Sequence, residues 1–355
     1  MTPPAFRSAA VIALVALALL WSGPLAAPAA AGALDMLARL QEIPALSGCE
    51  DSLRAALTAE LPGWSRPEVD ALGDLVVDCG GQGPVRLLAA PLDEPGYVVT
   101  AIDTLGYLRL ARLGGAGRLF DQFQVGQRFR VLTARGPLPA VSVAPSTHLR
   151  RAPVGEPLGV NDLWLDAGMR SGTEAGRAGI RLLDPVSPVE RCTRLAGLRL
   201  AGPGLEGRAE AVALLRALMG EKPAGRGHWV AAFTAQAQPG GRGLRRLVRR
   251  FQPAEVYLLG GFPKARAGLG PALQADSLRG LDAGLTQSLA RLGGKGVQRQ
   301  GPGLAPDRAG LDPLDSARVA VLGLPVRYAR TPVETVDAGD VEALAALLRK
   351  LLEAP

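Results

Sequence analysis

The sequence predicts an α/β fold with a mostly parallel sheet, helices on both faces, and a small β-barrel domain inserted into it. Three observations lead there. The 355 residues are too many for one typical core and suit two compact units. Strand-like and helix-like runs alternate near both ends of the chain, which is typical of a parallel sheet. The middle instead holds short apolar runs divided by glycine and proline.

The first part of the chain is expected to begin with two helices separated by a Pro-Ala-Leu-Ser-Gly turn at 44–48. Ser47 or Asp51 is a candidate cap for the second helix. Two strands follow, and the second is almost wholly apolar, as expected of a strand buried on both faces. The predicted ranges are 34–40 and 51–61 for the helices and 74–79 and 85–90 for the strands.

The middle of the chain is predicted to form the inserted β-barrel domain over residues 95–189. A short helix-like stretch at 173–178 interrupts its pattern once. Its strands are expected at 97–102, 108–113, 128–133 and 140–143. The α/β domain is then formed by 32–94 together with 190–355.

The last part returns to alternating helices and strands, and it closes with an amphipathic helix at 341–352. Helices are also predicted at 207–219, 243–251 and 282–292, with strands at 228–234, 256–259 and 319–322. With only 4% aromatic residues in a chain that is 48% hydrophobic, leucine, valine and alanine must fill most of the core.

The amino-terminal residues 1–31 are predicted to be a signal peptide. Arg7 precedes an apolar run from Ala9 to Trp21, and small residues at 29–31 suit a cleavage site. The run of roughly 13 apolar residues is short for a membrane-spanning helix, so an uncleaved anchor is the less favoured alternative. The mature protein is therefore expected to be exported, periplasmic or secreted, with no membrane contact after cleavage.

The chain has three cysteines, Cys49, Cys79 and Cys192, at spacings that match no metal motif. In an oxidising compartment one pair can form a disulfide, and Cys49 with Cys79 is the first pair to test. Buried free thiols are the alternative.

The net charge of +7 is uneven, because arginines crowd one predicted helix. Four of them fall near one helical face, which suits an acidic partner or an anionic surface, although a solvated face is the commoner explanation. No aromatic residues are interleaved, so nucleic-acid binding is not expected. The residues are Arg242, Arg245, Arg246, Arg249 and Arg250.

A series of short motifs, in this order over about 90% of the chain, resembles the tetrahedral-type (TET) dinuclear-metal aminopeptidases, which include glutamyl aminopeptidases and proteins once called endoglucanases. The motifs are IPALSGCED at 43–51, DALGDL at 70–75, LDEPGY at 92–97, VGQ at 125–127, STHL at 146–149, LWLDAG at 163–168, FTAQ at 233–236, LPVRY at 324–328 and TPVE at 331–334.

The resemblance implies an α/β peptidase domain, an inserted β-barrel domain used in subunit packing, and removal of amino-terminal residues from peptides. It also implies two metal ions, zinc or cobalt, and a carboxylate general base acting on a bridging water. Two cations lower the pKa of that water and polarise the scissile carbonyl, and they need histidine and carboxylate ligands.

The sequence departs from the family pattern where that chemistry resides. Pro91 replaces a histidine ligand, Ala237 replaces the general base, and Arg330 replaces the last histidine ligand. The other departures are Glu206 for the aspartate that bridges the metals, Gln238 for a carboxylate ligand, and Gly260 or Gly261 for an aspartate. Asp93, Glu206 and Glu334 remain as oxygen donors, and the two histidines, His148 and His228, match no ligand position.

These departures predict a catalytically inactive relative, a pseudopeptidase with a binding or scaffolding role and no metal cofactor. Its expected ligand is a peptide or a cell-envelope component, held near Arg330, Glu334 and Glu206, and homo-oligomers are expected through the inserted β-domain. The alternative is an active exported aminopeptidase with a rebuilt site, in which Asp93 and Glu206 hold divalent metal.

Overall fold

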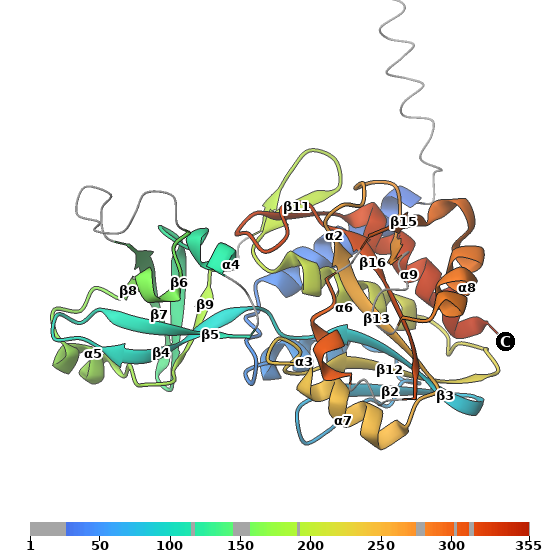
Figure 1. Cartoon of the computed structure of the whole chain (residues 1–355), viewed down its shortest axis with the longest axis horizontal. Coiled ribbons are helices and arrows are strands. Elements are labelled where there is room, and N and C mark those ends of the chain that lie inside the picture. Colours follow the sequence, from blue (N-terminus) through green and yellow to red (C-terminus); the bar gives the residue numbers. More distant parts are fainter. Residues whose placement is uncertain are drawn as a thin grey trace, which may run out of the picture.

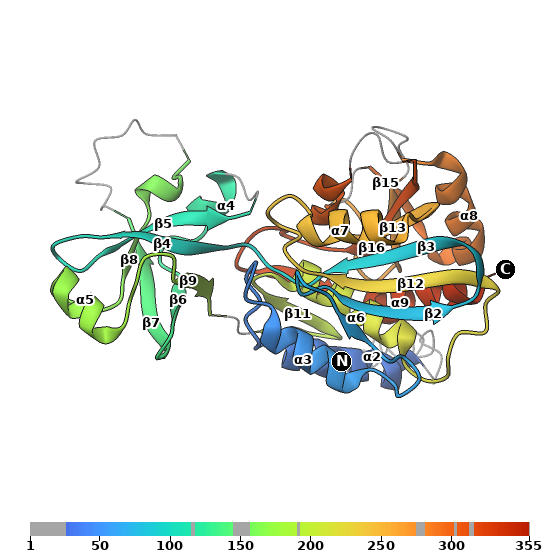
Figure 2. The same cartoon turned by 90° about the horizontal axis from the view of Figure 1, so that it is seen from below.

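The computed structural model shows two units, a large α/β unit and a smaller barrel beside it (Figures 1 and 2). The chain leaves the large unit after strand β3 (Gln82–Pro91) and returns after strand β9 (Pro185–Pro188). The structure describes residues 26–114, 118–144, 157–189, 192–274, 281–301, 304–311 and 316–354. Most of the predicted signal peptide and the STHL motif with His148 lie outside these residues.

An eight-stranded sheet forms the centre of the large unit in the described part of the chain, in the order β1-β2-β12-β3-β13-β16-β14-β15. The four central strands from β12 to β16 pair in parallel, whereas β1, β2 and β14 join by antiparallel pairing. The strands other than β3 are β1 (Glu68–Val69), β2 (Leu75–Gly80), β12 (Gly227–Thr234), β13 (Glu255–Phe262), β14 (Ala272–Gln274), β15 (Gln298–Gln300) and β16 (Arg318–Pro325).

Helices cover both faces of this sheet. Along β3, Leu88 and Ala90 pack with the larger helical layer, whereas Leu87 and Ala89 face the opposite core, because successive strand residues point to opposite faces. The larger layer contains α2 (Ala26–Gln41), α3 (Asp51–Glu60), α6 (Leu205–Leu218), α8 (Ala283–Gly293) and α9 (Ala338–Glu353). On the opposite face lies α7 (Arg242–Phe251). Short 3-10 turns occur at Val160–Asp162, Gly294–Gly296 and Pro306–Gly310.

Six strands close into the predicted barrel, in the order β4-β5-β8-β7-β6-β9. Its core alternates along the strands, with Tyr97 and Val99 of β4 and Phe129 and Val131 of β6 buried. The strands are β4 (Gly96–Ile102), β5 (Leu108–Leu113), β6 (Arg128–Thr133), β7 (Gly136–Val143), β8 (Trp164–Asp166) and β9, with helices α4 (Arg118–Gln122) and α5 (Gly172–Ala178). The predicted fold class, an α/β sheet with an inserted β-barrel, is therefore confirmed.

A small second sheet brings distant segments to the beginning of α6. Strand β11 (Arg199–Gly202) lies between β10 (Thr193–Arg194) and β17 (Glu334–Asp337), both antiparallel to it. Gly202 is paired with Glu334, so the carboxylate of Glu334 lies beside the first turn of α6. The sequence did not predict this sheet, because its strands are only two to four residues long.

One local expectation, the helix cap, meets a different outcome, and of the two alternatives for the cysteines the structure shows free thiols. The residue that precedes α3 is Glu50, and it makes no side-chain cap, so Ser47 and Asp51 are not the caps that the sequence suggested. The three cysteines are free thiols, and burial raises the pKa of Cys79 to about 12. Within the described ranges, no helix is both long and apolar enough to cross a membrane.

Candidate functional site

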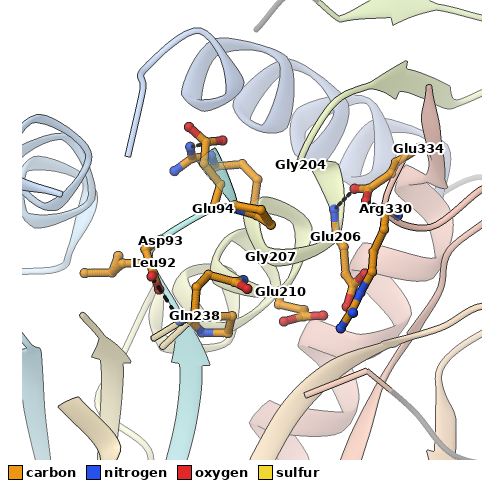
Figure 3. Close-up of a pocket in the computed structure, with 13 residues that line it drawn as sticks. Leu92, Asp93, Glu94, Gly204, Glu206, Gly207, Glu210, Gln238, Arg330 and Glu334 are labelled. Atoms are coloured by element: carbon orange, nitrogen blue, oxygen red, sulfur yellow. Dashed lines mark hydrogen bonds and ion pairs between the residues drawn. The ribbon is translucent and has the colours of Figure 1, made fainter. Parts of the chain in front are cut away.

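A narrow pocket lies where β3 and β12 end, beside the first turn of α6 (Figure 3). Carboxyl ends of parallel strands are the usual place for ligands in such sheets. The pocket encloses about 40 Å³, enough for a few water molecules or an ammonium group. The predicted site residues that line it are Pro91, Asp93, Glu206, Gln238, Arg330 and Glu334. Ala237 and Gly260 do not line it.

Asp93 is committed to the turn that follows β12. Its Oδ1 accepts the backbone N–H of Ala237 at 2.8 Å, and its Oδ2 accepts that of Gln238 at 3.0 Å and the hydroxyl of Ser47. The side chain is buried, and desolvation raises its pKa to about 7 against these hydrogen bonds. Both carboxylate oxygens of Asp93 are therefore used to hold this turn in place. Ser47, expected as a helix cap, instead holds Asp93 in place.

Two more carboxylates fix the same turn from other sides. Asp74 accepts the N–H of Ala235 at 2.7 Å, and Glu50 accepts the N–H of Gln236 at 2.9 Å. Burial raises the pKa of Asp74 to about 7. Gln236 takes a left-handed backbone conformation with φ of 52°. The turn is thus held so that Ala237, at the position where the resemblance places a general base, is fully buried.

The carboxylate of Glu206 fills the space beside Gly261. Its Oε1 lies 3.3 Å from the backbone nitrogen of Gly261, and a Cβ added to Gly261 would lie 2.7 Å from both Cγ and Cδ of Glu206. At Gly260, an added Cβ would lie 2.3 Å from the carbonyl oxygen of Leu304. Neither glycine can become aspartate without a local rearrangement. The longer Glu206 side chain reaches the space that a shorter aspartate would leave free.

Glu334 links the first turn of α6 to the loop before β17. Its two oxygens accept the backbone N–H groups of Glu206 at 3.0 Å and Arg330 at 2.6 Å. Burial raises the pKa of both Glu334 and Glu206, and the charge of Glu334 raises that of Glu206 further. Two neighbouring carboxyl groups in a buried site do not readily ionise at the same time, because their negative charges repel each other.

Arg330 supplies the positive charge at this pair. The residue is exposed, and its side chain extends beside that of Glu206 (Figure 3). Its charge lowers the pKa of both glutamates, opposing the effect of burial. Its backbone φ of 61° and that of Tyr328, 56°, are unfavourable for side chains with a Cβ. The loop is therefore held in a strained conformation that places a guanidinium at the rim.

The donor atoms present do not fit a pair of divalent cations. Two further acids line the pocket: Glu94 accepts the N–H of Ala45 at 3.1 Å and lies 3.6 Å from the guanidinium of Arg208, and Glu210 is fully buried on α6. Pro91 offers no side-chain donor, and Gln238 offers only an amide. In the ranges given above, no three histidine, cysteine or acidic side chains are grouped so that they could hold a metal ion. Two bridged cations need more ligands than this.

Some site residues were not foreseen. Ser47, Glu50, Asp74 and Glu94 lie within the quoted motifs, but the sequence predicted none of these contacts, because the partners are 46 to 186 residues away. His228 lies elsewhere, 3.2 Å from Asp78, and takes no part in the pocket.

Comparisons with known proteins agree with the fold. Residues 73–265, more than half of the chain, match the family model described as M42 glutamyl aminopeptidase. A lysyl aminopeptidase of Pyrococcus furiosus is 26% identical over 90% of this chain and 96% of its own. A glutamyl aminopeptidase of Lactococcus lactis is 32% identical, over 43% of this chain and 44% of its own. The TET1 peptidase of Pyrococcus horikoshii superposes with a TM-score of 0.79 at 26% identity, covering 90% of this chain and 99% of that one.

Proposed function

Because the chain belongs to the M42 glutamyl aminopeptidase family, we propose that it is an exported relative that binds peptide amino termini without hydrolysing them. One observation carries the proposal. Ala237 stands where the family resemblance places the general base, and it is fully buried with its N–H donated to Asp93. A methyl group cannot take a proton from water.

Family membership also corrects one expectation from the sequence. Members of this family are dinuclear metal enzymes, so the expectation that no metal cofactor is involved is wrong for the family to which the chain belongs. Two divalent cations would supply a polarised carbonyl and an activated water. The donor set of this pocket does not fit such a pair. Binding of the peptide is therefore assigned to side chains of the protein itself.

Binding of an amino terminus is supported by the size and chemistry of the pocket. Its about 40 Å³ admits a terminal ammonium group but no peptide chain. Glu206 and Glu334 face this space from the start of α6 and from β17. An ammonium donates three hydrogen bonds, and carboxylates are its natural acceptors. Arg330 at the rim is placed to meet a peptide carbonyl or carboxylate, so the peptide would lie across the opening.

A paired measurement tests this function. Calorimetry with a short peptide should give binding when its amino terminus is free and none when it is acetylated. Aminoacyl-nitroanilide substrates should show no turnover, with or without added zinc, cobalt or manganese. Hydrolysis that increases with stoichiometrically bound metal would contradict the proposal. If the acetylated peptide bound as tightly as the free one, the peptide's ammonium group would have no role in binding.

A second candidate is an active aminopeptidase with a rebuilt metal site. It is favoured by the family's metal chemistry and by Glu206, whose Oε2 accepts no hydrogen bond from any residue that the structure describes. In this case Glu206→Ala abolishes a measurable peptidase activity, and Glu206→Gln lowers it strongly. Unchanged turnover in both variants would exclude Glu206 as the ligand.

We further propose export through residues 1–31 and assembly into homo-oligomers. The apolar run after Arg7 supports the first, and the inserted barrel supports the second. The related TET1 peptidase of Pyrococcus horikoshii assembles into a tetrahedron or a large octahedral shell. Amino-terminal sequencing of secreted protein and light scattering of the mature chain test the two points, and a monomer at working concentration would contradict the second.

A further inference from the structure

One face of α7 carries a dense positive charge, and none of its arginines lines the pocket. The helix buries Leu244, Leu247 and Val248 against the sheet, so its polar residues must point outward. Five arginines do so, and all are exposed. They are Arg242, Arg245, Arg246, Arg249 and Arg250. The helix, at the lower edge of the large unit, contains no acidic residue (Figure 1).

Only part of this charge is neutralised within the chain. Arg246 lies 2.7 Å from Asp70, and Arg250 holds Glu68 through two hydrogen bonds of 2.8 and 2.7 Å. These acids belong to strand β1 and the turn after it. The other three arginines have no carboxylate partner among the described residues: Arg242 meets the side-chain oxygen of Gln236, and Arg245 a backbone carbonyl.

These three arginines form one stripe. Arg242, Arg245 and Arg249 are spaced by three and four residues, so successive members are neighbours on the helix, with Cβ atoms about 5–6 Å apart. Together with Leu72, the five arginines of α7 line a shallow groove of about 560 Å³. We call it the arginine groove. Its walls therefore provide repeated guanidinium forks along a line.

The chemistry of the groove selects among anions. A guanidinium donates two parallel hydrogen bonds, and a carboxylate is satisfied by one such fork, as Arg250 and Glu68 show. A phosphate has more oxygens and can bridge two neighbouring forks. No large apolar side chain of α7 is exposed, so the helix has nothing to insert into a lipid layer. The one ring of α7, Phe251, is half-buried and lies under the guanidinium of Arg250 at 4.7 Å, so it is not free to stack a nucleic-acid base.

We propose that the arginine groove binds a linear, base-free polyanion that carries phosphate groups along its length. The unpaired stripe of Arg242, Arg245 and Arg249 provides the principal contacts. Arg250 contributes by exchanging its exposed pair with Glu68, whereas Arg246 stays paired with the nearly buried side chain of Asp70. This surface is separate from the pocket, and the proposal does not depend on peptide binding.

The test uses the mature full-length protein and long-chain inorganic polyphosphate as the probe. Replacing the stripe with glutamine in an Arg242→Gln, Arg245→Gln, Arg249→Gln variant should weaken binding at least tenfold. Each phosphate contact that is lost means one fewer counterion released on binding. The plot of log affinity against log salt should therefore become shallower, with the magnitude of its negative slope smaller by about 2. Folding is checked by the unfolding midpoint, which the exposed positions should leave unchanged.

A matched control carries the same charge change on the barrel. Arg170, Arg177 and Arg181 are also exposed, and changing all three to glutamine should leave polyphosphate binding within twofold of the wild type. An equal loss of polyphosphate binding in both variants would mean that net charge alone explains the effect. It would contradict the proposal that the arginine groove is the binding site. Poly-glutamate binding as tightly as polyphosphate would overturn the preference for phosphate. Binding to anionic lipid vesicles with none to polyphosphate would also overturn the proposal.

Discussion

The side chain of Glu206 occupies the space in which a side chain at Gly261 would have to begin. A Cβ at Gly261 would lie 2.7 Å from Cδ of Glu206, closer than real Cβ contacts occur. The two residues come from the first turn of α6 and from β13, 55 positions apart. With Glu206 in this position, a side chain at 261 could be added only if Glu206 and Val326 moved. The residues at 206 and 261 are therefore structurally coupled.

This coupling predicts a non-additive pair of substitutions. Gly261→Asp should lower the free energy of unfolding by about 1–3 kcal/mol, the usual cost of overpacking. Adding Glu206→Asp should recover much of that loss, because the shorter side chain frees the space. Urea unfolding of the two single variants and the double variant measures the coupling. Gly63, with no atom near its added Cβ, serves as the control for an added aspartate. Strict additivity would contradict the shared space.

Asp93 should make stability depend on pH. Its pKa of about 7 in the fold is raised from a reference value near 3.8. The folded state then holds a proton that the unfolded state has released, so stability falls as pH rises from about 4 to about 7. The slope is at most about 1.4 kcal/mol per pH unit for one proton. The Asp93→Asn variant should flatten this slope, and Asp78→Asn, at an exposed side chain, should not. An unchanged profile would mean that Asp93 stays ionised throughout.

A single substitution should not restore a general base. Ala237 is fully buried and its turn is fixed by three carboxylates, so Ala237→Glu should destabilise the protein by about 2–4 kcal/mol. No peptidase activity should appear when zinc or cobalt is added. The control is Gln238→Glu, at a partly exposed neighbour, which should cost less stability. A stable Ala237→Glu variant with turnover would show that the remaining residues already hold the metals.

Peptide binding should strengthen as pH rises through the raised pKa values of Glu206 and Glu334. Ionised carboxylates accept hydrogen bonds from an ammonium, whereas protonated ones compete as donors. The amino terminus of a peptide keeps its charge below its own pKa of about 7.7–8.0, so binding measured below that pH isolates the titration of the pocket. Calorimetry between about pH 5.5 and 7.5 should show rising affinity, and Glu206→Gln should remove most of the rise. A flat profile for the wild type would contradict the carboxylate role.

Much of the scaffold was accessible from the sequence. Apolar runs in the sequence predict buried strands such as β3 and β12. The alternation of leucines and arginines predicts α7, with its leucines buried and its arginines exposed. The short strands β14, β15 and β17 escaped prediction, because runs of three or four residues carry no periodicity of their own. The boundaries of helices also moved, most clearly for α2, which begins at Ala26.

The sequence by itself determined the family, the order of elements and the vacancies at Pro91, at Ala237 and at Gly260 or Gly261, since a residue without a donor atom cannot gain one by folding. Only the tertiary structure decided what fills those places. It turned Asp93 toward the turn after β12, brought Glu334 to the start of α6 and placed Glu206 against Gly261. Such contacts join segments 55 to 144 residues apart, and burial then sets the charge of each carboxyl group. No local pattern in a sequence encodes either effect.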